Sequence, residues 1–278
     1  NNISKFMGIF NGTSNFILSK MTHEQTTFKD ALEEAQRLGF AEADPTDDVE
    51  GVDAARKVVI TSYLSFNQVI KLNDVKLVGI SDITLADINA ASALNYKIKL
   101  IGKGTYENGY VNASVEPTLI HKNHQLAAVE NEYNAIYVIG DAVGDTMFYG
   151  KGAGSLATGS AVVSDLLNVA LFFESNLHTL PPHFELKTEE TKEMMDGAEP
   201  VVIQEKSNYY IVISHSHKSL EKVEYDIKKK LPFHKSLQLV ERDQDTYAII
   251  VTGIETSPEK VLNQSGFNIK KVYPVEGV

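Results

Sequence analysis

The 278-residue sequence contains no cysteine and no tryptophan. Without cysteine it can form no disulfide and no thiolate nucleophile, which fits a reducing compartment such as the cytoplasm. Basic residues are also scarce, because 26 Lys and Arg stand against 37 Asp and Glu and the formal net charge is −11. This balance argues against a protein that binds nucleic-acid phosphates or an anionic membrane surface.

Long apolar runs and targeting signals are lacking as well. No apolar stretch approaches the roughly 20 residues of a transmembrane helix, and no signal peptide is visible. The length allows one large or two ordinary domains, and 43% hydrophobic residues supply a core. The chain starts at Asn1 without methionine and almost at once enters an ordered-looking segment, so we expect it to begin inside a larger protein, with a processed N-terminus as the alternative.

Helix and strand signals follow one another through the first half of the chain. The turn at 11–13, the capping residue Thr27 and the terminating Gly39 mark helix ends, and 107–109 is typical of a hairpin turn between two Ile- and Val-rich runs. The spacing predicts helices over 15–21, 28–38, 49–66 and 85–94, then strands over 97–103, 110–120, 126–129 and 135–140. We therefore expect an α+β fold in which a mixed or antiparallel sheet is packed with helices.

A glycine-rich stretch at 150–154 precedes an apolar helix expected over 160–173. Backbone N–H groups of such a loop can hold an anion at a helix N-terminus, but a tight structural turn explains the glycines equally well. The sequence lacks the G-x-G-x-x-G pattern after a strand that marks a dinucleotide-binding unit.

The remaining third of the chain has a different pattern. Residues 181–199 contain two prolines and a charged run, so they are the best linker candidate. Beyond them, the order of strands and helices between 209 and 275 is βαββαβ, a small ferredoxin-like unit. We therefore predict a domain over 1–180, a linker over 181–199 and a second domain over 200–278. His215 and His217 are expected to be exposed loop residues, and no metal site is predicted, because no third ligand lies at a suitable spacing.

The acidic segment from Gly39 to Lys57 is the most informative part of the chain. It holds six carboxylates and closes on a lysine, with a loop in its first half and a helix in its second. Such an arrangement can grip the ammonium group of an amino acid and lets a lysine exchange a proton with a reacting oxygen. A plainer interpretation stands beside it: acidic residues favour helix N-termini, and Asp53 with Lys57 four residues later makes an ordinary surface ion pair.

Three segments resemble homoserine dehydrogenases: GIFNGTSNFIL (Gly8–Leu18), LGFAEADPTDDVEGVDAARK (Leu38–Lys57) and GDTMFYGKGAGSLATGSAVVSDLL (Gly144–Leu167). The resemblance covers about residues 1–175, and the C-terminal unit resembles the ACT-type regulatory domain of many bacterial members. It implies NAD(P)-dependent interconversion of L-homoserine and L-aspartate 4-semialdehyde in threonine and methionine biosynthesis. It also implies that NADP, or NAD, is bound mainly by an N-terminal Rossmann domain missing from this chain.

The resemblance also assigns roles to individual residues. Lys57 falls on the family's catalytic lysine, and Asp53 supports it. Glu42 and Asp48 match carboxylates that bind substrate, and Gly12 and Thr13 match a turn that touches it. Gly152 and Gly154 match the contact to the nicotinamide cofactor. A second family lysine and the monovalent-cation loop would lie upstream of Asn1.

The expected partners are the small-molecule substrate, L-threonine as an effector, and a second copy of the chain in a homodimer or higher oligomer. Threonine control rests on the resemblance alone, because residues 214–218 replace the glycine-rich turn common in ACT domains. Two other functions compete. A hydrolase could use Glu42 with Asp48 or Asp53, although the tryptophans that stack on sugars are absent. A non-catalytic amino-acid-binding module would bind threonine or homoserine and have no redox role.

Overall fold

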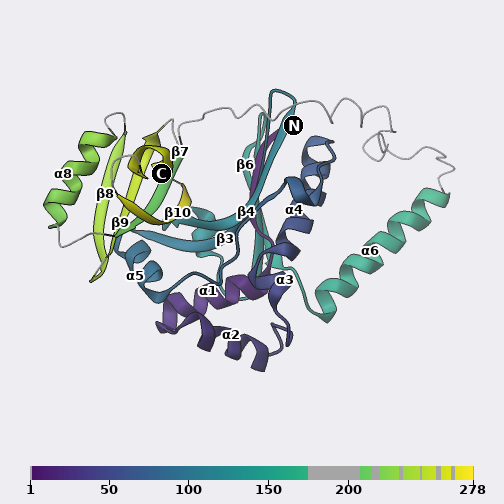
Figure 1. Cartoon of the computed structure of the whole chain (residues 1–278). Coiled ribbons are helices and arrows are strands. Elements are labelled where there is room, and N and C mark those ends of the chain that lie inside the picture. The colour runs from purple at the N-terminus through teal and green to yellow at the C-terminus, as the bar shows by residue number, and fades with distance from the viewer. Residues whose placement is uncertain are drawn as a thin grey trace.

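The computed structural model describes residues 2–174, 207–214, 219–231, 234–244, 246–254, 258–263 and 267–277. The predicted linker and the loop that carries His215 and His217 lie outside these residues. Figure 1 shows the described part as one extended sheet with helices packed against it.

The sheet has ten strands, in the order β6-β5-β1-β3-β4-β10-β7-β9-β8, and β2 pairs with β4 beside this path. Pairing is antiparallel except for the β10–β4 and β2–β4 pairs, which are parallel, so the sheet is mixed. The predicted α+β class is confirmed. The strands of the first part are β1 (Ile3–Ile9), β2 (Lys76–Leu77), β3 (Tyr96–Glu107), β4 (Tyr110–His121), β5 (Tyr133–Gly140) and β6 (Gly144–Lys151).

The helices of the first part lie between these strands in sequence, and α1, α4 and α5 supply most of the helical residues of the main core. Alternate residues of β3 serve two clusters, as a pleated strand requires: Ile98 and Leu100 join the main core, whereas Ile101 joins a smaller cluster with η2. The helices are α1 (Gly12–Glu24), α2 (Phe28–Arg37), α3 (Thr46–Val49), α4 (Val52–Phe66), α5 (Leu85–Ala93) and α6 (Ser155–Glu174), with 3-10 turns η1 (Leu72–Asp74) and η2 (Gln125–Ala128).

The C-terminal unit has the predicted βαββαβ order. Its strands lie in the order β10-β7-β9-β8, which is the ferredoxin-like arrangement. Ile211 and Ile213 of β7 pack with α8, while Tyr210 and Val212 on the other face join the main core of the first part. The two parts therefore share both a sheet and a core. The elements are β7 (Ser207–Ser214), α8 (Leu220–Lys230), β8 (Ser236–Asp243), β9 (Thr246–Ile254), α9 (Pro258–Asn263) and β10 (Asn268–Glu276).

A buried carboxylate ties the C-terminal unit to α5. The Asp87 side chain is fully buried, and its two oxygens accept from Arg242 of β8 at 2.8 Å and from Lys271 of β10 at 2.7 Å. Burial by itself would raise the pKa of Asp87, but the hydrogen bonds from these two cations outweigh it and hold the pKa below its usual value. Where β10 pairs with β4, Glu276 of β10 forms ion pairs with Lys5 of β1 and Lys103 of β3.

The structure corrects several predicted elements. Residues 126–129, predicted as a strand, lie mostly in the 3-10 turn η2, and β1, β6 and the short helix α3 were not predicted. The helix predicted over 49–66 is interrupted at Gly51, which has a φ of +80° and precedes α4. Only part of the glycine-rich loop predicted over 150–154 is a loop, because Gly150 and Lys151 are the last residues of strand β6.

Helix α6 extends away from the rest of the molecule (Figure 1) and leaves its apolar side chains exposed. Its stretch Ser155–Phe173 has 19 residues and a mean hydropathy of 1.6, so by length and composition it is able to cross a membrane. The expectation that no apolar run approaches this length was therefore wrong, although core helices of soluble proteins meet the same criteria.

Candidate functional site

The acidic segment separates into two groups of carboxylates. The first group has local partners: Asp44 accepts from Thr46 at 2.6 Å, Asp47 pairs with the Arg56 guanidinium at 2.5 Å, and Glu50 accepts from the Ser81 hydroxyl. Asp48 and Asp53 point instead toward α1 and Lys57. The plain interpretation of acidic residues near helix N-termini therefore suits the first group only.

Helix α4 presents Asp53 and Lys57 on one face, because residues four apart in a helix are neighbours. The Lys57 Nζ donates to Asp53 Oδ2 at 2.7 Å and to the Phe10 carbonyl at 3.0 Å. The Lys57 side chain is 46% exposed and that of Asp53 31% exposed. The ammonium is thus held on two sides and remains open to solvent.

Asn11, which the sequence analysis placed only in a turn, joins the two carboxylates. Its Nδ2 donates to Asp48 Oδ1 at 2.6 Å and to Asp53 Oδ2 at 2.9 Å, while its Oδ1 accepts from the Ser14 N–H and caps α1. The sequence signal was available, because asparagine is a preferred N-cap residue and Asn11 directly precedes α1. Asn11 thus links Asp48 to Asp53, and Asp53 in turn binds Lys57, so three of the predicted site residues form one cluster.

A cavity of about 400 Å³ lies beside this cluster. Its walls come from α4, β1, β5 and β6, with Lys57, Asn134 and Lys151 among the polar side chains and Phe10 and Tyr149 among the aromatic ones. Lys151 also pairs with Glu132 at 3.0 Å, and this contact raises the pKa of Lys151. A cavity with aromatic walls and a few polar groups is typical of a small-molecule site.

Of the glycines predicted to meet a cofactor, Gly152 lines this cavity and Gly154 does not. A Cβ at Gly152 would lie 2.3 Å from Asn134 Nδ2, so only glycine fits there without displacing that side chain. Gly154 has a φ of +108° and open space around it. Glycine is therefore favoured there for its backbone conformation just before α6, and not for lack of space.

The predicted substrate residues Glu42, Asp48, Gly12 and Thr13 do not line the cavity either, and Asp53 reaches it only through its contact with Lys57. Glu42 is exposed in the loop after α2. Thr13 is buried, and its hydroxyl donates to the Phe40 carbonyl at 2.7 Å. A Cβ at Gly12 would lie 2.6 Å from the Glu132 carbonyl oxygen. Gly12 and Thr13 therefore anchor the start of α1, and the structure does not bring Glu42 to the Lys57 cluster.

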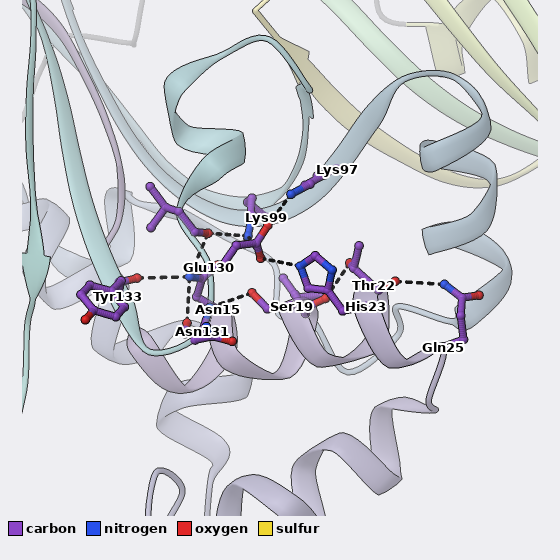
Figure 2. Close-up of polar contacts among 12 residues, drawn as sticks. Asn15, Ser19, Thr22, His23, Gln25, Lys97, Lys99, Glu130, Asn131 and Tyr133 are labelled. Carbon is purple, nitrogen blue, oxygen red and sulfur yellow. Dashed lines mark hydrogen bonds and ion pairs between the residues drawn. The ribbon is translucent and has the colours of Figure 1, made fainter.

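A second polar cluster, which was not predicted from the sequence, lies alongside α1, between this helix and Lys99 of β3 (Figure 2). The Lys99 ammonium is buried and donates to Val129 O at 2.6 Å, Asn15 Oδ1 at 3.1 Å and Glu130 Oε2 at 3.3 Å. Asn15 Nδ2 in turn contacts the carbonyls of Val129, Asn131 and Tyr133 at 2.9–3.2 Å. This cluster fixes the loop that leads into β5 and hence to Asn134.

Charge and burial oppose one another in that cluster. Burial lowers the pKa of Lys99 to about 8, against the pull of Glu130. Burial would raise the pKa of Glu130, but the charge of Lys99 and hydrogen bonds from Lys97 and Ser19 lower it to about 2. Both groups are charged near neutral pH. Among the described residues, no group of three or more His, Asp or Glu side chains is placed to hold a metal ion.

Comparison with known proteins gives a consistent result. The family model described as homoserine dehydrogenase matches residues 1–167, and the model of the homoserine dehydrogenase C-terminal domain matches residues 206–278. Homoserine dehydrogenase of Bacillus subtilis is 55% identical over 167 residues, which cover 60% of this chain and 39% of that protein. That of Neisseria gonorrhoeae is 45% identical over 183 residues, covering 66% of this chain and 42% of that protein.

Solved structures agree. The S. aureus homoserine dehydrogenase at pH 7.5 superposes with a TM-score of 0.88 at 72% identity, covering 100% of this chain and 66% of that chain. A hyperthermophilic archaeal homoserine dehydrogenase mutant in complex with NADPH is more distant, with a TM-score of 0.52 at 29% identity over 61% of this chain and 48% of that chain. The chain thus spans only part of the length of these relatives.

Proposed function

The chain belongs to the homoserine dehydrogenase family, and from this premise we propose that the protein of which it forms part interconverts L-homoserine and L-aspartate 4-semialdehyde with NADP or NAD. This is an oxidoreductase step of threonine and methionine biosynthesis. The observation that carries the proposal is the Lys57 ammonium, which lies between Asp53 and the Phe10 carbonyl and faces the cavity. A lysine held in this way can give a proton to a substrate oxygen or take one from it.

The cavity suits the nicotinamide end of such a cofactor. Residues 150–152 line it, and neither Gly150 nor Gly152 carries a side chain that would block a flat ring. Phe10 and Tyr149 add aromatic surface. When bound, the cofactor supplies the hydride chemistry, and the protein's share is binding and orientation. Gly152 would contact it directly, and Gly154 would set the backbone path beside it.

The residues of this chain then act as follows. Lys57 moves one proton at the substrate oxygen, and Asp53 holds the Lys57 ammonium in place. Asp48, fixed by Asn11, offers a carboxylate to the substrate ammonium, and Glu42 joins it if its exposed loop closes over the substrate. Gly12 and Thr13 fix the first turn of α1, so that Asn11 stays in position to donate to Asp48 and Asp53.

The remaining features belong to the same proposal. We place the nucleotide-binding Rossmann domain in the part of the relatives that this chain does not span, and the domain boundaries at 1–180, 181–199 and 200–278. The C-terminal unit, whose strand order fits an ACT domain, is the proposed place for L-threonine to act. We further propose a cytoplasmic homodimer or higher oligomer.

The alternative functions find less support. A hydrolase would need two carboxylates facing one ligand, but Asp48 and Asp53 are both bonded to one asparagine and Glu42 lies apart from them. A module that only binds amino acids is disfavoured by the match of residues 1–167 to the dehydrogenase family model. Both alternatives predict no redox turnover.

The test is homoserine-dependent reduction of NADP⁺ by this protein with its nucleotide-binding part included. Lys57→Ala should lower kcat by roughly 10²–10⁴, the usual range for a general acid–base group. Lys29→Ala, at an exposed lysine of α2, is the matched control and should retain full activity. An unaltered protein that does not oxidise homoserine would sink the dehydrogenase proposal.

A further inference from the structure

The Phe10 carbonyl accepts two hydrogen bonds at the cavity wall. Lys57 Nζ donates to it at 3.0 Å, and Asn134 Nδ2 donates at 3.2 Å. These two donors come from α4 and β5, which lie far apart in the sequence. A carbonyl oxygen has two lone pairs, so both bonds can form together, and the direction of each depends on the same peptide group.

The surroundings of Asn134 favour this one orientation. The residue faces Gly150 across the β5–β6 pair, and its Nδ2 lies where a side chain at Gly152 would otherwise be. The reversed amide would turn its oxygen toward the Phe10 carbonyl, where two acceptors would repel. The carbonyl of the preceding residue, Tyr133, is held by Asn15 at 3.1 Å.

The other amide atom of Asn134 gains nothing from this arrangement. Its Oδ1 is buried and has no hydrogen-bond partner among the residues that the structure describes. A buried unsatisfied acceptor costs stability, so for folding alone an apolar side chain of similar shape would serve as well. Asparagine is therefore present at a cost, and its Nδ2 donates to the Phe10 carbonyl, which also accepts from the candidate catalytic lysine.

We propose that Asn134 is a positioning residue for Lys57, acting through the Phe10 carbonyl. The inference rests on the proposed function and names one more residue on which proton transfer depends. By fixing the carbonyl, Asn134 fixes the second of the two acceptors that aim the Lys57 ammonium at the cavity. Displacing a reacting group by about 1 Å can cost up to about 100-fold in rate.

The experiment compares Asn134→Leu and Asn134→Asp, both close in size to asparagine and neither able to donate, with Asn112→Leu, an exposed position on β4 outside the cavity. Turnover is measured with homoserine and NADP⁺ in the protein with its nucleotide-binding part. We expect kcat and kcat/KM to fall together, by about 10- to 100-fold, in both Asn134 variants. Asn112→Leu should match the unaltered protein.

Thermal unfolding separates positioning from a merely structural role. The Tm of Asn134→Leu should stay within about 3 °C of the unaltered protein, because the lost hydrogen bond and the lost unsatisfied acceptor offset each other. Full turnover in Asn134→Leu would overturn the inference, and so would a turnover loss accompanied by a large fall in Tm. A rise in KM with kcat unchanged would also overturn it, since that indicates substrate binding.

A spectroscopic measurement keeps the inference distinct from the proposed function. The ¹³C resonance of the Phe10 carbonyl should shift in Asn134→Leu and in Lys57→Met, because each removes one hydrogen bond, and should stay in place in Asn112→Leu. If the unaltered protein fails to oxidise homoserine but these shifts occur, the proposed reaction is wrong, whereas the two hydrogen bonds to the Phe10 carbonyl are supported. Absence of the shifts overturns the inference whatever the activity.

Discussion

Two lysines of this molecule lie in opposite settings. Lys57 on α4 has a side chain that is 46% exposed, with one carboxylate beside it and a cavity in front. Lys99 on β3 has a side chain that is 2% exposed, and Val129, Asn15 and Glu130 occupy its three N–H groups. Lys99 shows the strongly shifted pKa, yet it has no donor left for a ligand.

The difference shows that a shifted pKa does not by itself mark a catalytic group. Burial accounts for the shift at Lys99, and structural ion pairs shift pKa values as catalytic sites do. Access decides between the two roles. Lys57 can reach a small molecule in the cavity, whereas Lys99 stabilises the loop that supports the cavity wall.

The largest loss of stability is expected when the buried lysine, Lys99, is replaced. Lys99→Met should lower the free energy of unfolding by about 3–5 kcal/mol, because Glu130 and two other acceptors lose a buried donor. Lys97→Met, which removes a partly exposed lysine from the same carboxylate, is the matched control and should cost clearly less. Urea unfolding measures both, and equal losses in the two variants would contradict a special role for burial.

A somewhat smaller loss of stability is expected in acid, where Glu130 of the same cluster becomes protonated. The pKa of Glu130 is about 2 in the folded protein against an ordinary value of 4.5, so its stabilisation is fully present above pH 4.5 and is lost as the pH falls toward 2. The shift corresponds to about 3 kcal/mol. Free energies of unfolding between pH 5 and pH 2 should fall less steeply in Glu130→Gln, and identical pH slopes would rule out this contribution.

A smaller effect is expected at the contact with the C-terminal unit. Asp87→Asn removes the negative charge between Arg242 and Lys271, and the free energy of unfolding should fall by about 1–3 kcal/mol. Both cations keep other partners, Asp243 and the Asp82 carbonyl. Hydrogen exchange in β8 and β10 should accelerate in this variant and stay unchanged in Glu221→Gln on the exposed side of α8. Unchanged exchange in β8 and β10 would mean that Asp87 does not couple the two parts.

Local sequence predicted much of the framework. Thr27 caps α2, and Gly39 follows it with a φ of +77°. The hairpin glycine is Gly109, also with positive φ. Lys57 and Asp53 share one face of α4 because helical spacing alone places them there. The ferredoxin-like order followed from the succession of strand-like and helix-like stretches between 209 and 275.

The parts that were missed depend on contacts between distant segments. Strand β6 forms by pairing with β5, and its glycines and polar residues give little strand signal of their own. Asn11 meets Asp53 across 42 positions, Lys99 meets Asn15 across 84, and Asn134 meets Phe10 across 124. Periodicity carries no information on such pairs, so the residues that hold the site together emerge only from the fold.

The different roles of the two lysines are tested most directly by measuring turnover and thermal stability together in Lys57→Met and Lys99→Met. We expect Lys57→Met to lose roughly 10²–10⁴ in kcat while its Tm is unchanged. We expect Lys99→Met to lose stability, while kcat per folded molecule, measured below its Tm, stays within about tenfold of the unaltered protein. The reverse outcome, with chemistry lost at Lys99 and only stability lost at Lys57, would contradict it.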